Sequence, residues 1–295
     1  MKKRSFKAVL LLFVLTTLTI ALGGCSGDKK GDISSQITIG IPQDLEDSLD
    51  PHKMVTAGTR EVLFNIFEGL VKVTSDGDFV PAVASSYEET EGGKVYTFTL
   101  RDNVKFHDGS TVTAEDVKFS LDKCADTSAG EPLVAAFSNI DSVNILDDKT
   151  VQVVLKEADT EFLAYMTTAI IPASNADPDT NPIGTGPYKF VSRSPQENFV
   201  MERFDDYWGE PAYIKDVTFK ICANADTIVM DLEGGSIDMF ARVTSTQAAE
   251  LSDNFNVLEG TMNLVQALYL NNAEAPFDNE KVRQALCYAI DPQEI

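Results

Sequence analysis

The pattern of hydrophobic and polar positions predicts strands and short helices that alternate along most of the chain. Residues 36 to 41 carry an isoleucine at every second position, which is typical of a strand, and Pro42 ends it. A helix with an apolar stripe is predicted from about Ala57 to Glu68. Another begins at Thr113, because Thr113-Ala-Glu-Asp116 has the pattern of a capping box. Further strands are predicted at 96–100, 104–106, 143–145, 151–155, 188–192, 199–204, 214–222, 237–240, 255–258 and 263–270, and further helices at 160–168, 226–233, 245–251 and 278–290. This mixture favours an α/β fold with mixed sheets.

The beginning of the chain follows a different pattern. Four basic residues precede an apolar run from Ala8 to Leu22, and the sequence then reads Leu22-Gly23-Gly24-Cys25. A signal peptidase requires small side chains before its cleavage site, and the thiol of Cys25 can carry a diacylglyceryl lipid. The run of about 15 residues is short for a bilayer crossing of about 20, although a transmembrane anchor is the alternative. We expect a lipoprotein signal peptide over residues 1–24, and a lipidated Cys25 with a flexible tether over 25–35.

Composition narrows the classes of function. The formal net charge of −22 repels phosphates, so a nucleic-acid partner is not expected, and the acidity favours solubility. The hydrophobic content of 43% can support more than one domain. Cys124, Cys222 and Cys287 are far apart, odd in number and without a CxxC motif. We therefore expect buried free thiols rather than disulfides or a metal site.

Motifs for catalysis are absent. The sequence contains no GxSxG, HExxH, P-loop or GxGxxG pattern. His52 and His107 lie on predicted turns, where a hydrogen-bonded role is expected and a pH-sensitive or metal-binding role is the alternative. Gly184-Thr-Gly186-Pro-Tyr188 looks like a phosphate loop, but Pro187 lacks an amide donor and no helix pattern follows, so a backbone turn is predicted. We expect neither an enzyme nor a cofactor.

The last residues of the sequence have the pattern of a helix that is just beginning. An amphipathic helix from Asp278 to Ile290 is followed by Asp291-Pro292, a cap residue and a first-turn proline that begin another helix. The sequence stops three residues later. We therefore expect this chain to be a fragment of a longer protein.

Several segments, in order, resemble one family: the bacterial extracellular solute-binding proteins of family 5, the dipeptide/oligopeptide type. They are Ser48–Lys53 with Phe67–Leu70, Tyr96–Gly109 followed by Thr113–Val117, Pro182–Tyr188, Asp206–Gly209, Gly235–Asp238, and Pro276–Asp278 with Val282–Asp291. The resemblance spans nearly everything from Ile37 to Ile295.

The resemblance implies a type II periplasmic-binding-protein-like fold whose two lobes close on a ligand and deliver it to an ABC permease. It assigns residues 36–54 plus 172–262 to the first ligand-facing lobe and 55–171 to an extra inserted α/β domain. Residues 263–295 would begin the second lobe. Family members are roughly twice as long, so most of that lobe would be missing, together with the aspartate that grips a peptide's amino terminus.

On the first lobe, the resemblance points to backbone groups of two segments that would face the ligand. These positions are Glu46, Asp47, Ser48, Ala241, Arg242 and Val243. Arg242 is either a partner for a ligand carboxylate or a solvated surface charge. The aromatic residues Tyr188, Tyr207 and Trp208 are expected to pack rather than to stack on a ligand.

The sequence thus predicts a monomeric, lipid-anchored binding protein on the extracytoplasmic face of the membrane, which captures peptides for ABC transporter permease subunits. Alternatives with the same fold are receptors for a nickel chelate, haem, an opine or an oligosaccharide, or a ligand sensor. A secreted hydrolase would need a pair of carboxylates at defined positions, and no such pair is apparent.

Overall fold

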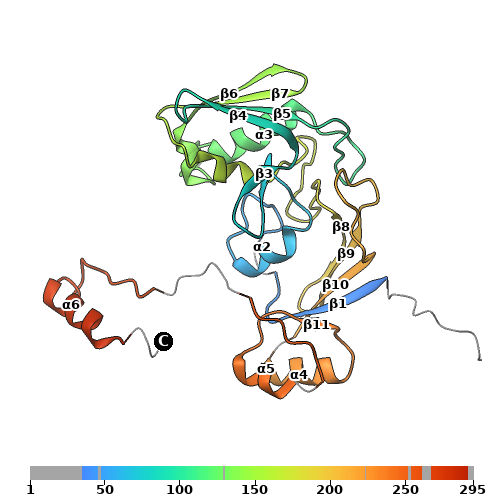
Figure 1. The fold of residues 1–295 in the computed structure, drawn as a ribbon, viewed down its shortest axis with the longest axis vertical. Helices are drawn as coiled ribbons and strands as arrows, with labels where there is room; N and C mark the ends of the chain where they lie inside the picture. The colour runs from blue at the N-terminus through green and yellow to red at the C-terminus, as the bar shows by residue number, and fades with distance from the viewer. Residues whose placement is uncertain are drawn as a thin grey trace, which may run out of the picture. The chain divides into compact units, whose positions relative to one another are not determined.

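A computed structural model describes residues 35–45, 48–128, 130–222, 224–251, 254–260 and 267–291 (Figure 1). The chain divides into two units, Met1–Val243 and Thr244–Ile295. The larger unit contains a five-stranded sheet, a four-stranded sheet and a two-stranded hairpin. The mixed α/β class predicted from the sequence is confirmed.

The five-stranded sheet has the order β11-β1-β10-β9-β8. Its β1 runs parallel to both β10 and β11, whereas β8, β9 and β10 pair antiparallel. The alternating isoleucines of β1 are partly buried and pack against the core of this sheet, and both edges of the strand are paired. The strand bounds are β1 (Gln36–Ile41), β8 (Tyr188–Ser194), β9 (Asn198–Arg203), β10 (Asp216–Ile221) and β11 (Met239–Phe240).

Helix α2 (Ala57–Leu63) contributes to the core of this sheet. Leu63 and Ile66 are fully buried and share a cluster with Phe199, Met201 and Phe219 of the strands. The helix begins at the N-cap Thr56, whose hydroxyl accepts from the amide of Thr59. Helix α4 (Ala225–Glu233) follows β10 and begins at Asn224, whose side chain accepts from the amide of Thr227.

The four-stranded sheet is antiparallel, with the order β4-β5-β7-β6. Helix α3 (Ala114–Ala125) packs with it, and Thr113 and Asp116 form both bonds of the predicted capping box. Together with the hairpin, these elements enclose a second apolar core, which includes Tyr96, Phe98 and Phe106. The remaining bounds in this part are β2 (Val71–Val73), β3 (Phe79–Pro81), β4 (Ala84–Thr90), β5 (Val95–Leu100), η1 (Ala135–Asn139), β6 (Ile140–Asp147), β7 (Thr150–Leu155) and η2 (Phe162–Thr167).

The segment Gly184–Tyr188 joins the two cores as a backbone turn, as the sequence predicts. The amide of Gly186 donates to Ile66 O at 2.9 Å, and the amide of His107 donates to Gly184 O at 3.0 Å. A Cβ at Gly184 would collide with Ile66 O, and one at Gly186 would lie 2.5 Å from Asn65 O. Only glycine allows this close approach of two backbones.

Several predicted elements are wrong in extent or type. The helix expected to reach Glu68 ends at Leu63, and Asn65 then donates its side-chain amide to Val62 O. The helix expected at 160–168 is the 3₁₀ helix η2, and the strand expected at 104–106 is a single bridge between Lys105 and Thr111. Residues 255–258 and 267–270 form no strand, and residues 263–266 lie outside the described residues.

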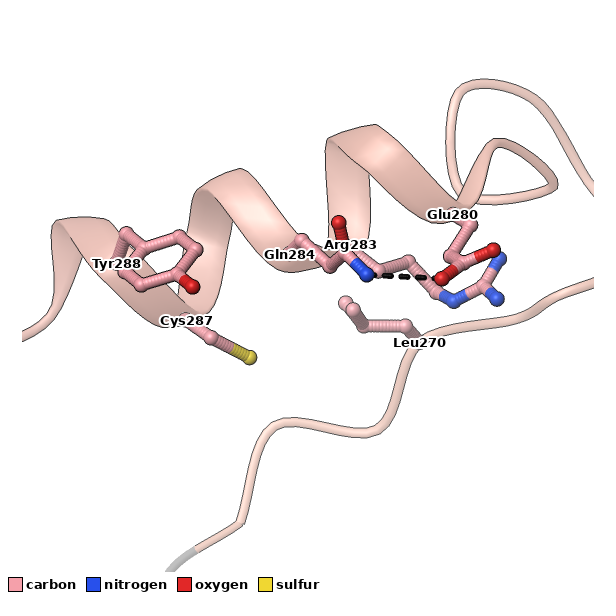
Figure 2. A pocket seen from close by; sticks show the side chains of 6 residues that line it. All are labelled: Leu270, Glu280, Arg283, Gln284, Cys287 and Tyr288. Carbon is pink, nitrogen blue, oxygen red and sulfur yellow. Dashed lines mark hydrogen bonds between the residues drawn. The ribbon is translucent and has the colours of Figure 1, made fainter.

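The smaller unit contains α5 (Ser245–Leu251) and α6 (Glu280–Ala289), and α6 begins at the N-cap Asn279. Figure 2 shows α6 with Leu270 beside it and with Gln284 donating to Glu280, at 2.8 Å. No residue of α6 is buried, and the residues of its predicted apolar stripe are exposed or half-buried. Cys287 on this helix is exposed as well, which corrects the expectation that every thiol is buried; Cys124 and Cys222 are buried and free.

Candidate functional site

A groove of about 650 Å³ lies between side chains of the five-stranded sheet and those of α2, and it reaches the residues that follow the parallel strands β1 and β11. The carboxyl ends of parallel strands are where open α/β sheets bind ligands. Strand β1 supplies its end and the two residues that follow, Pro42 and Gln43, and β11 leads into Ala241 and Arg242. The lining residues are Ile37, Ile39, Gly40, Ile41, Pro42, Gln43, Thr56, Ala57, Gly58, Glu61, Val62, Phe64, Asn65, Tyr188, Met201, Ile214, Val217, Phe219, Met239, Ala241 and Arg242.

Most of the groove wall is apolar, and its polar groups are few. The side chains of β1, β9 and β10 form an aliphatic and aromatic floor. Phe64, at the end of α2, also lines the groove and is 65% exposed. Gln43, Asn65, Glu61 and Arg242 contribute the side-chain amides and charges. An apolar pocket with a few polar groups is the usual composition of a site for a small molecule.

Arg242 is held in a defined position. Its φ of 68° lies in the left-handed region, which a non-glycine residue seldom adopts, and its guanidinium forms an ion pair with Glu61 of α2. Both side chains are 47% exposed, so solvent reaches the pair. The structure thus brings Ala241 and Arg242 into the groove. Val243 ends the larger unit and does not line it.

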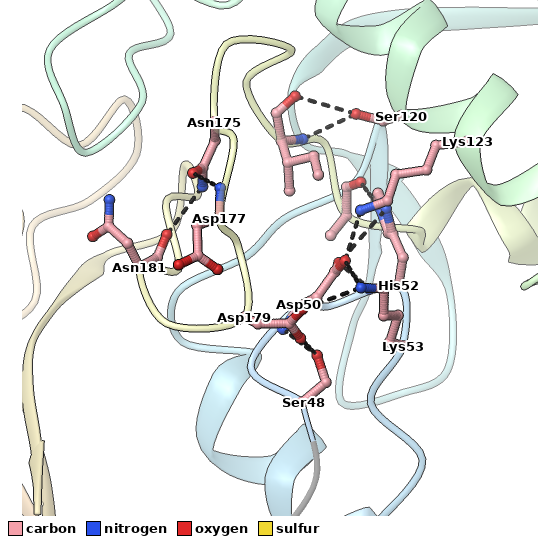
Figure 3. Close-up of polar contacts among 12 residues, drawn as sticks. Ser48, Asp50, His52, Lys53, Ser120, Lys123, Asn175, Asp177, Asp179 and Asn181 are labelled. Atoms are coloured by element: carbon pink, nitrogen blue, oxygen red, sulfur yellow. Dashed lines mark hydrogen bonds and ion pairs between the residues drawn. The ribbon is translucent and has the colours of Figure 1, made fainter.

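Ser48 lies elsewhere. Its hydroxyl donates to Asp179 and accepts from the amide of Asp50 at 2.9 Å, and it does not line the groove (Figure 3). Glu46, Asp47 and Cys25 lie outside the described residues. The proposed ligand-facing role of residues 46–48 and the lipid on Cys25 therefore stay predictions.

A buried ionic cluster lies next to Ser48, and sequence reasoning missed it. Asp50 is fully buried and accepts from Lys123 Nζ of α3 at 2.7 Å, with Lys53 Nζ 3.7 Å away (Figure 3). His52 donates from Nε2 to Ala169 O at 2.8 Å, and burial lowers the pKa of its imidazole. A buried aspartate was not predictable, because Leu49-Asp50-Pro51-His52 has the composition of an ordinary surface turn.

His107 has the hydrogen-bonded turn role that the sequence predicts. Nε2 donates to Gly186 O at 3.0 Å, and Nδ1 accepts from the amide of Gly184 at 3.3 Å. These two bonds require the neutral imidazole. Burial lowers the pKa of His107 to about 4. The described side chains form no group of three or more histidine, cysteine, aspartate or glutamate residues that could hold a metal ion.

Trp208 and Tyr207 pack, as predicted. Trp208 Nε1 and the Tyr207 hydroxyl donate to the carboxylate of Glu68 at 2.6 and 2.7 Å, and Trp208 packs against the core of the four-stranded sheet. Burial raises the pKa of Glu68. Tyr188 also packs, with its hydroxyl bonded to Ile214 O at 2.8 Å, but its ring forms part of the groove wall.

Comparison with known proteins decides the family. The profile of the bacterial extracellular solute-binding proteins, family 5 (middle region), matches residues 78–295. This chain belongs to family 5. It is therefore a member of a family of solute-binding proteins rather than of enzymes.

Other family 5 proteins support the assignment. The chain is 30% identical over 259 residues to the glutathione-binding protein GsiB of Pectobacterium atrosepticum, with 83% of this chain and 50% of the relative covered. It is 29% identical to the oligopeptide-binding protein AppA of Bacillus subtilis, with 99% of this chain and 59% of AppA covered. The chain thus spans about half the length of the curated relatives it matches.

Solved structures share the fold. NikZ from Campylobacter jejuni, in complex with Ni(L-His), has a TM-score of 0.77 at 25% identity, with 89% of this chain and 54% of NikZ covered. DppA from Helicobacter pylori, in complex with the peptide STSA, has a TM-score of 0.75 at 25% identity, with 88% of this chain and 57% of DppA covered. Among the described residues, no helix has the length and apolar composition to cross a membrane.

Proposed function

We propose that this chain supplies one lobe of a two-lobed receptor that captures peptides outside the cytoplasmic membrane and presents them to an ABC transporter permease. The observation that carries the proposal is the groove at the ends of β1 and β11, with Arg242 at its rim. Its volume of about 650 Å³ suits a ligand the size of a short peptide. Family membership and the names of the relatives AppA and DppA support the peptide cargo.

In the proposed mode, the ligand lies along the carboxyl ends of the strands. The backbone groups of Ala241 and Gln43 bond its main chain independently of its sequence, and the apolar floor contacts its side chains. Arg242 exchanges its exposed partner Glu61 for the carboxylate of the peptide. A second lobe then closes over the ligand, and the permease binds the closed form. A lipid on Cys25 would keep the receptor at the membrane surface.

A receptor with a different cargo is the second candidate, because structures with 25% identity or more include NikZ with Ni(L-His) and AgaA with agropinic acid. The test is isothermal titration of the complete two-lobed protein with a tetrapeptide, glutathione, Ni(L-His) and an opine under matched conditions. Micromolar binding of the tetrapeptide alone supports the peptide proposal. Tight binding of one of the other solutes, with none of the peptide, overturns the peptide cargo.

A further inference from the structure

Two cationic side chains lie against Trp208, and a third, Lys149, lies beside Arg101, in a protein whose net charge is −22. Arg101 Cζ lies 4.4 Å, and Lys72 Nζ 5.1 Å, from the centroid of the indole ring. Lys149 Nζ lies 3.2 Å from the carbonyl oxygen of Arg101. Such a concentration of positive charge is unusual on an acidic surface, and no part of the proposed groove requires it.

Two of these cations, Arg101 and Lys149, line a pocket of about 460 Å³ on the four-stranded sheet. Its walls come from β4, from the end of β5 with the turn that follows it, and from Trp208. The lining residues are Ser85, Thr99, Leu100, Arg101, Asp102, Lys149 and Trp208. The volume lies in the range of sites for small solutes.

Hydrogen bonds hold the walls of the pocket in place. Arg101 donates from Nε to Ala82 O at 2.6 Å and from Nη2 to Pro81 O at 3.4 Å. The carboxylate of Glu68 holds Trp208 by accepting from its indole N–H at 2.6 Å. Backbone carbonyls orient the guanidinium without neutralising its charge, and Nη1 of Arg101 makes no hydrogen bond within the described part of the chain.

One carboxylate lines the pocket, and it is poorly held. Asp102 Oδ1 lies 3.5 Å from Lys149 Nζ, and its side chain is 87% exposed. An exposed pair of this kind contributes little free energy, so another anion can replace Asp102 at low cost. The remaining groups of the wall, the hydroxyls of Ser85 and Thr99, can add hydrogen bonds to a bound anion.

We propose that this pocket is a second binding site, which takes a small carboxylate-bearing anion. One carboxylate accepts from Nη1 of Arg101, and Lys149 turns from Asp102 to the same ligand. The site is separate from the groove and does not depend on the identity of the cargo there.

The fluorescence of Trp208 provides the test, because it is the only tryptophan of the chain. We expect succinate, added to the purified chain, to change the emission saturably at millimolar concentrations, and the affinity to fall with added salt. Succinamide has the same size without the charge and should give no change. Lys149→Met should weaken binding by about tenfold, as for the loss of one charge-assisted bond. Asp102→Asn should tighten it by about threefold, because the competing carboxylate is gone.

Lys215→Met is the matched control, since it removes the same charge from an exposed position outside the pocket and should leave the affinity unchanged. If Lys149→Met does not fold, Arg101→Lys tests the same site, because it keeps the charge and loses the donor fork. Equal responses to succinate and succinamide, or an affinity that neither Lys149→Met nor Asp102→Asn changes, would overturn the proposal.

Discussion

Lys123 Nζ on α3 lies 2.7 Å from the carboxylate of Asp50, a residue 73 positions earlier that is fully buried. The bond ties the loop after β1 to the helix that packs on the four-stranded sheet. Ser120 of α3 adds a second connection, because it accepts from the amide of Ile171, which belongs to the core of the five-stranded sheet, at 3.0 Å (Figure 3). The two cores of the larger unit are thus joined by buried polar bonds as well as by apolar contact.

Replacement of Asp50 should therefore destabilise the protein more than replacement of an exposed aspartate nearby. We expect Asp50→Asn to lower the free energy of unfolding by about 2 kcal/mol, because it leaves Lys123 without its counter-charge in a mostly buried position. Asp179→Asn is the matched control. Its side chain is 42% exposed, and the loss should stay below about 1 kcal/mol. Urea unfolding followed by circular dichroism measures both free energies. A larger loss of stability in Asp179→Asn than in Asp50→Asn would contradict the structural role of the buried Asp50–Lys123 pair.

His107 should remain neutral in the folded protein until the pH falls to about 4. Its folded pKa lies below the usual value of 6.5, so the folded state binds fewer protons than the unfolded state between these two values. The stability that it contributes is complete above about pH 6.5 and is lost as the pH falls toward 4, at up to about 1.4 kcal/mol per pH unit. NMR titration of the imidazole in His52→Asn, which leaves one histidine, measures the value directly. A midpoint near 6.5 would contradict the burial and the two backbone bonds described here.

Two glycines should respond in opposite directions to alanine. Gly184→Ala should lower the free energy of unfolding by about 2 to 3 kcal/mol, because the new Cβ would collide with the backbone oxygen of Ile66. That backbone cannot move without disturbing the buried core. Gly58→Ala, within α2, should raise the free energy of unfolding by about 0.5 to 1 kcal/mol, because alanine favours the helix more than glycine does. The new methyl group meets no atom within 4 Å outside the helix's own backbone. Thermal unfolding compares the two variants. A gain in stability for Gly184→Ala would show that the two backbones are less close than described.

The predictions from sequence succeeded where one local rule determines the structure. The capping box at Thr113 and the alternation of residues 36–41 are decided by hydrogen bonding and period alone, and both are confirmed. The end of α2 was missed because the chain leaves the helix at Phe64 to meet Gly186, a contact distant in sequence. The alternating residues 255–258 satisfy the strand pattern, but they have no partner strand among the described residues.

The candidate site was predicted only in part. The resemblance to family 5 directed attention to Ala241 and Arg242, which line the groove, and also to Ser48, whose hydroxyl bonds Asp179 instead. The apolar floor formed by β9 and β10 carries no distinguishing motif, because its alternating side chains are those of any half-buried strand. Likewise, no local pattern indicates that Arg101 and Lys149, which lie in two connections between strands, line one pocket with Trp208.

The proposed lipid anchor can be tested by changing one residue. Cys25→Ala should stop cleavage of the signal peptide before residue 25 or release the protein from membranes, because the thioether to the diacylglyceryl lipid requires the sulfur of Cys25. Membrane fractionation with metabolic lipid labelling measures both effects, and Cys287→Ala is the matched control. A Cys25→Ala protein that is still processed and lipid-labelled in the membrane fraction would refute the anchor.

In the proposed function, Arg242, which lines the groove, binds the carboxylate of a peptide. The most direct measurement is isothermal titration of the complete two-lobed protein, and of its Arg242→Gln variant, with one peptide in two forms: a free carboxyl terminus and an amide. We expect Arg242→Gln to weaken binding of the free acid by about tenfold and to change binding of the amide little, whereas Lys215→Gln should affect neither. Equal affinities for the acid and the amide in both proteins would contradict it.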